Sequence, residues 1–187
     1  NSTAALERWR QHLTIIRAAA SDKTPASGSF EFPASGSFGM ESAQIGHVFE
    51  GRAASQFGKT MVNVRATTID ELVRRDMGGK VPQILSIDAE GFDGLVLRGA
   101  NQTLRAGGLE YIEFEYHNIG PWKGMQLRDT IDYLDESGYS CYWAQPRLVR
   151  ITGCWNWGKF ANRHEWSNVV CARRAEAVRS KSLEQSA

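Results

Sequence analysis

The chain has 187 residues, of which 42% are hydrophobic and 23% are charged, and its formal net charge at pH 7 is +1. This is the composition of an ordinary globular protein, and the length suffices for one domain with a sizeable core. A net charge this close to zero gives no basic surface of the kind that neutralises nucleic-acid phosphates, and no apolar run is long enough to span a bilayer. We therefore expect one domain that has no nucleic-acid partner and no membrane segment within the visible chain.

The amino-terminal part predicts a helix followed by a strand. Leu6, Trp9 and Leu13 have the spacing of one helical face. Residues 14–20 are mostly apolar and predict a buried strand, which ends in the polar turn at residues 21–22. Because the chain starts at Asn1, a targeting or anchoring segment upstream would not be visible, and the compartment stays open.

A short duplication separates this strand from the next one. The motif Pro-Ala-Ser-Gly-Ser-Phe occupies residues 25–30 and again residues 33–38, and two copies are compatible with a hairpin or with a mobile loop. Polar and apolar residues alternate over residues 61–66, which predicts a strand. Thr68 and Glu71 then form a capping-box pattern, in which each side chain satisfies a backbone N–H of the other residue at the start of a helix.

The remaining elements alternate between strands and helices of about ten residues. This order predicts a mostly parallel sheet with helices on both faces, and the last two strands, which have no helix between them, predict an antiparallel pair at the edge. The sequence predicts a central strand at 84–87, a turn at 88–91 and a helix at 92–99, then a strand at 111–116, a helix at 127–134 and the final strands at 139–143 and 168–172.

Polar residues follow three of the predicted strands, where ligands bind in open parallel sheets. Asp88 and Glu90 end an apolar strand, so they are either site residues or acids in the first turn of a helix. Asp22 is also open to two interpretations, ligand contact or a local turn. Glu115 and His117 have same-face spacing in a strand, which places an acid beside a proton acceptor or simply makes a salt-linked strand end.

The cysteines and the aromatic residues near the carboxyl terminus give weaker signals. Three cysteines at these spacings match neither a zinc site nor a disulfide framework, so we expect thiols that are free or buried. The aromatic residues could form the wall of a substrate pocket or pack in the core. The residues concerned are Cys141, Cys154 and Cys171, and Trp155, Trp157, Phe160 and Trp166.

Four segments in order resemble the FkbM-type methyltransferases. They are Val-Asn-Val-Arg-Ala-Thr-Thr-Ile-Asp-Glu-Leu at 62–72, Ile-Leu-Ser-Ile-Asp-Ala-Glu-Gly at 84–91, Val-Leu-Arg-Gly-Ala at 96–100 and Glu-Phe-Glu-Tyr-His at 113–117. The segments at 18–22 and 166–172 also look like the family's third strand end and last strand.

The resemblance implies an α/β fold of the Rossmann-like class I methyltransferase type, with S-adenosylmethionine as cofactor. It implies O-methylation of a hydroxyl on a sugar, a glycan or a small metabolite, and no metal site. Carried over by position, the resemblance places the adenine near Asp22 and the reaction at two strand ends. The expected cofactor-binding residues are Ser21, Asp22 and Asp88, and the expected catalytic residues are Asp88, Glu90, Glu115 and His117.

Two departures from the family pattern qualify this expectation. Ser86 replaces the usual lysine, and the glycine-rich first strand and turn of the fold are missing from the visible sequence. We therefore expect residues 1–174 to be an N-terminally truncated methyltransferase domain that binds the cofactor poorly by itself, followed by a polar tail at 175–187. The alternatives are a glycosyltransferase that holds a divalent cation with Asp88 and Glu90, and a non-catalytic binding module.

Overall fold

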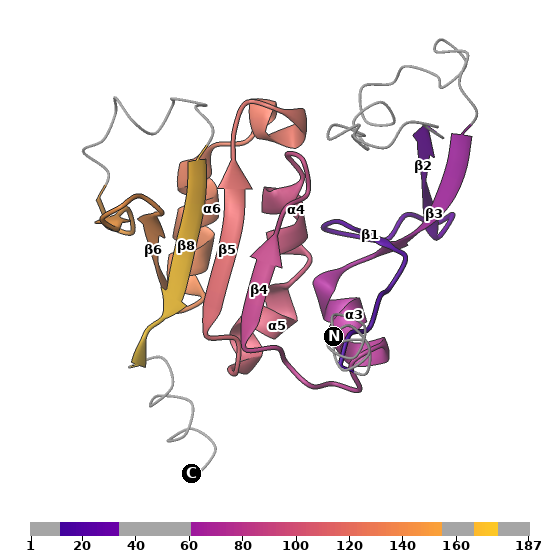
Figure 1. The fold of residues 1–187 in the computed structure, drawn as a ribbon, viewed down its shortest axis with the longest axis horizontal. Helices are drawn as coiled ribbons and strands as arrows, with labels where there is room; N and C mark the ends of the chain where they lie inside the picture. The colour runs from indigo at the N-terminus through magenta and orange to yellow at the C-terminus, as the bar shows by residue number, and fades with distance from the viewer. Residues whose placement is uncertain (1–11, 34–60, 155–166, 176–187) are drawn as a thin grey trace, which may run out of the picture.

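The computed structural model describes residues 12–33, 61–154 and 167–175, and it forms two sheets (Figure 1). The smaller sheet has the order β1-β3-β2 and the larger one the order β4-β5-β8-β6-β7. The strands are β1 (Ala19–Ala20), β2 (Ser29–Pro33), β3 (Met61–Thr67), β4 (Ile84–Ile87), β5 (Tyr111–Tyr116), β6 (Tyr139–Trp143), β7 (Val149–Arg150) and β8 (Ser167–Arg173). The helices are α3 (Ile69–Arg75), α4 (Asp93–Arg98), α5 (Asn101–Ala106) and α6 (Leu127–Glu136), with a 3-10 helix, η2 (Gly120–Gly124).

The sheets are mixed, and the prediction of a mostly parallel sheet was wrong. Among the described strands β4 and β5 are parallel, as are β1 and β3, and the other pairings are antiparallel. The physical reason is the place of β8, which lies between β5 and β6 and pairs antiparallel with both. The predicted antiparallel pairing of the last two strands is confirmed, since β6 and β8 pair, but β8 is interior and not at the edge of the sheet. Conversely, β4 was predicted to be central and forms one edge of the larger sheet in the described part of the chain.

The core lies between the larger sheet and the helices behind it in Figure 1. The strand predicted at 111–116 is confirmed as β5, and alternation along it buries Ile112, Phe114 and Tyr116 in one core cluster with residues of α4, α5 and α6. The opposite face is open among the residues that the structure describes: Ile84 and Tyr111, which are partners in register, are 66% and 55% exposed. The prediction of helices on both faces is thus not met in the described residues, because both βαβ crossovers proceed in one direction along the sheet and cover one side.

The smaller sheet differs from the sequence expectation at its start. Residues 12–17 are exposed, and only Ala19–Ala20 of the predicted strand pair with β3. The first copy of the duplicated motif forms a turn at 25–28 and begins β2, which pairs antiparallel with β3. The second copy, apart from Pro33 at the end of β2, and most of the predicted first helix lie outside the described residues.

The predicted helix starts are largely confirmed. Thr68 caps α3, since its hydroxyl oxygen accepts a hydrogen bond of 3.1 Å from the backbone N–H of Glu71. The Glu71 carboxylate, however, accepts hydrogen bonds from Arg75 and Thr24, which lower its pKa.

Within residues 12–33, 61–154 and 167–175, no helix combines the length and apolar character needed to cross a membrane.

A disulfide joins Cys141 of β6 to Cys171 of β8, so the expectation of unpaired thiols was wrong for these two cysteines. The two residues are direct partners in the antiparallel register, and both are buried. Cys154 is a free, exposed thiol. The disulfide cross-links β8 to β6, the strand next to the β7 edge of the larger sheet.

Candidate functional site

Two loops meet where β4 and β5 end, and glycines allow the contact. Gly91 has φ 96° in the loop after β4, and a Cβ at this position would lie 2.4 Å from the carbonyl oxygen of Ile119 in the loop after β5. Gly120 has φ 54°, and its Cβ would lie 3.3 Å from the carbonyl oxygen of Glu90. A Cβ is strained in this region of backbone space; at Gly91 it would overlap backbone atoms, and at Gly120 it would make a tight contact. The loop after β4, residues 88–91, is here called the acidic loop, and it packs directly on the loop that follows His117.

The acidic loop borders a cavity of about 370 Å³ that lies next to β4. Its walls are mostly apolar and come from residues 18–20, Phe32 and residues 85–87, among others. Asp88 and Glu90 also line the cavity; Asp88 is exposed and Glu90 is half-buried. The structure therefore brings both predicted acids to one hollow of the surface, beyond the end of an apolar strand.

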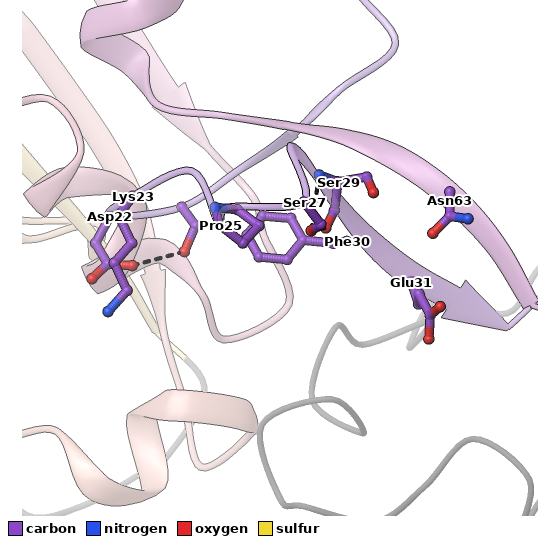
Figure 2. A pocket seen from close by; sticks show the side chains of 9 residues that line it. Asp22, Lys23, Pro25, Ser27, Ser29, Phe30, Glu31 and Asn63 are labelled. Carbon is purple, nitrogen blue, oxygen red and sulfur yellow. Dashed lines mark hydrogen bonds between the residues drawn. The ribbon is translucent and has the colours of Figure 1, made fainter.

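The predicted adenine-side residues lie in a second cavity, also of about 370 Å³ (Figure 2). Ser21 is buried and its hydroxyl donates a hydrogen bond of 3.1 Å to the carboxylate of Asp22. Glu31 and Asn63, which face each other in the register of β2 and β3, line the same cavity. Asp22 and Asp88 are thus in different cavities, and the segment 18–23 contributes to both.

Glu115 and His117 form the pair that their spacing predicted. The Nε2 atom of His117 lies 3.8 Å from Oε2 of Glu115, and the two side chains are 3% and 19% exposed. The indole Nε1 of buried Trp122 donates a hydrogen bond of 3.0 Å to the carbonyl oxygen of Glu115, which fixes η2 against this strand end. Glu115 and His117 line neither of the two cavities described above.

Asp93 is a polar residue of this region that the sequence interpretation missed. It is 0% exposed, and burial raises its pKa to about 6 while backbone hydrogen bonds, including those from Glu115 and Gly91, lower it. The sequence did contain a signal. Asp93, Leu97 and Ala100 fall at i, i+4 and i+7 on the buried face of α4 and its continuation, so an acid in that series had to be internal.

Other predicted features give no site in the described residues. No group of three or more His, Cys, Asp or Glu that could hold a metal ion occurs within the described part of the chain. The aromatic cluster at 155–166 lies outside the described residues.

Comparison with known families supports the resemblance seen in the sequence. The model of the Methyltransferase FkbM domain matches residues 1–141, which include both acidic strand ends and both cavities. No curated protein and no solved structure matches the chain. With three quarters of its length matched, the chain belongs to the FkbM methyltransferase domain family.

Proposed function

We propose that this chain carries the acceptor-side residues of an S-adenosylmethionine-dependent O-methyltransferase that acts on a hydroxyl of a sugar, a glycan or a small metabolite. The observation that carries the proposal is the junction of two loops. The loop with Asp88 and Glu90 lines a mostly apolar cavity and is packed on the strand end with the Glu115–His117 pair. Membership of the FkbM family supports the reaction class.

The residues around the two cavities fit the methyl donor. When bound, S-adenosylmethionine supplies a methyl group on a positively charged sulfur atom. A mostly apolar hollow that has the carboxylates of Asp88 and Glu90 in its lining suits a cation that needs a counter-charge. Ser21 and Asp22, at the neighbouring cavity, offer a hydroxyl and a carboxylate to the donor's nucleoside.

The acceptor hydroxyl must lose a proton as its oxygen becomes the nucleophile, and the chain provides two sources of a general base. One is the carboxylate pair of the loop after β4. The other is His117, whose Nε2 atom lies 3.8 Å from the Glu115 carboxylate at the end of β5. We assign Asp88 and Glu90, which line the cavity, to orientation of the acceptor hydroxyl and acceptance of its proton, and the Glu115–His117 pair, which lines neither cavity, to support of the loop junction from the end of β5.

The experiment uses the protein in the full length that its gene encodes, with isotopically labelled S-adenosylmethionine and a panel of sugars, glycans and small alcohols. Glu90→Gln is expected to lower kcat by about 100-fold, the size typical of a lost acid–base group, and His117→Asn by a smaller factor, through disturbance of the loop junction. The matched control is Glu113→Gln, an exposed acid on the same strand as Glu115, which should retain wild-type kcat.

Thermal unfolding of each variant separates a chemical loss from a folding loss. The assignment is wrong if both substitutions leave kcat at the level of the control. The reaction class is wrong if label passes to a nitrogen acceptor and to none of the hydroxyl acceptors in the panel.

A further inference from the structure

We infer that Asp93 is a positioning residue that holds the acidic loop after β4 against the end of β5. The inference deepens the proposed function, because this contact sets Asp88 and Glu90 relative to the Glu115–His117 pair. It is carried by the hydrogen bonds of one buried carboxylate.

The Asp93 carboxylate accepts backbone hydrogen bonds at both oxygens, and the donors include two different segments. Gly91 N–H donates to Oδ2 at 3.2 Å and Glu115 N–H donates to Oδ1 at 3.2 Å. The first donor belongs to the acidic loop and the second to β5. The side chain therefore bridges the acidic loop and the end of β5, without contact with solvent.

The acidic loop has a backbone conformation that needs such support. Glu90 has φ 48° and Gly91 has φ 96°, so two consecutive residues are left-handed and the first of them carries a side chain. Non-glycine residues adopt this conformation at a cost and keep it where surrounding contacts fix it. The hydrogen bond to the N–H of Gly91 is one such contact and the packing of Gly91 on Ile119 is the other.

The choice of an acid at this buried position is difficult to explain by stability alone. Burial of a carboxylate is unfavourable, and at Asp93 burial raises the pKa. A carboxylate nevertheless has two oxygens that both accept, whereas the amide of asparagine has one acceptor and would turn its NH₂ group toward the other N–H. The geometry at Asp93 uses both oxygens, which explains why an acid serves here.

The test compares Asp93→Asn with Thr103→Val in the full-length protein. Thr103 is a matched control because it is also buried and its hydroxyl donates to a carboxylate, that of Asp70, at 2.7 Å. We expect Asp93→Asn to lower kcat about tenfold or more through misplacement of the loop, with a smaller change in KM, while Thr103→Val leaves kcat near wild type at a comparable loss of thermal stability.

A readout independent of activity is amide hydrogen exchange. In Asp93→Asn the amides of Gly91 and Glu115 should exchange about tenfold faster than in Thr103→Val. If the full-length protein shows no methyl transfer, this readout still tests the role of Asp93, so failure of the proposed function and failure of the inference are distinguishable. Unchanged exchange at both amides, or kcat equal to that of the control, would overturn the inference.

If Asp93→Asn does not fold, a measurement on the wild-type protein replaces it. The carboxyl carbon of Asp93 and the amide protons of Gly91 and Glu115 are followed by NMR as the pH is lowered. We expect the three signals to titrate together, because protonation of the carboxylate weakens both hydrogen bonds. Amide signals that ignore the titration of Asp93 would refute the bridge.

Discussion

Replacement of Gly91 by alanine perturbs the contact between the two loops most directly. The new Cβ would lie 2.4 Å from the carbonyl oxygen and 2.8 Å from the carbonyl carbon of Ile119, and these are backbone atoms that cannot rotate away. In addition, Gly91 has φ 96°, where an L side chain is strained. Two separate costs therefore act at this position, backbone strain and a steric clash.

The expected loss in the free energy of unfolding is the sum of the backbone strain and the steric clash. Left-handed backbone costs roughly 1–2 kcal/mol for a residue with a Cβ, and overpacking of a tight contact costs roughly 1–3 kcal/mol. Gly91→Ala should lower the free energy of unfolding by about 2–5 kcal/mol in total. Gly79→Ala is the control, because Gly79 has φ 79° but its Cβ would meet nothing within 4 Å, so only the strain of about 1–2 kcal/mol applies.

Urea unfolding of the two variants and the wild type measures the difference. The effect of alanine on the unfolded chain is common to both variants and cancels in the comparison. We also expect Gly91→Ala to lower methyltransferase activity beyond any effect of Gly79→Ala, since relief of the clash separates the two loops. Equal destabilisation by both substitutions would show that the loops are not in the close contact described here.

Three further predictions concern other parts of the fold. Burial raises the pKa of Asp93 from 3.8 to about 6, so the native state binds more protons between these values and the free energy of unfolding falls as pH rises through this window. The difference between wild type and Asp93→Asn should shrink by about 2 kcal/mol from about pH 4.5 to about pH 7, and a difference independent of pH would contradict the burial of this carboxylate. Thiol titration of the denatured, unreduced chain should find only Cys154, whereas three thiols without reduction would refute the bond between Cys141 and Cys171; reduction should lower the free energy of unfolding by about 3 kcal/mol. Thr68→Ala should lower it by about 1 kcal/mol through loss of the α3 cap, and no change in urea unfolding would contradict the cap.

Elements with a strong local pattern could be predicted from the sequence. The alternation over β5 predicts its bounds, Tyr111–Tyr116, and its buried face, because a period of two is a property of the strand itself. The cap at Thr68 is equally local, since it involves residues three apart. The segment before β1 shows the limit of this reasoning: residues 14–17 have apolar members, yet Ile15 is 78% exposed, because burial depends on a partner and not on composition.

The sequence predicts only part of the surroundings of β8. The predicted antiparallel pairing of the strands at 139–143 and 168–172 is confirmed by β6 and β8, whereas the pairing of β8 with β5 depends on contacts between segments far apart in the chain and was missed. The disulfide was missed because the pattern indicates the two strands but not their register, which places Cys171 opposite Cys141.

For the candidate site, the rule that ligands bind beyond the carboxyl ends of strands indicates where the acids lie in the fold, but not that they are divided between two cavities. Asp88 and Glu90 share a cavity, and Glu115 and His117 form a pair, as their positions in the strands indicated. The separation of Asp22 into a second cavity depends on the turn that follows β1 and could not be deduced from spacing.

The most direct test of the account is the destination of the methyl group. The full-length protein is incubated with S-adenosylmethionine that carries ¹³C in its methyl group and with the best acceptor of the panel, and the product is analysed by NMR. The account predicts the label on a hydroxyl oxygen of the acceptor, with transfer greatly reduced in Glu90→Gln and unchanged in Glu113→Gln. Label on nitrogen or carbon, or transfer to oxygen that is equally fast in Glu90→Gln, would contradict it.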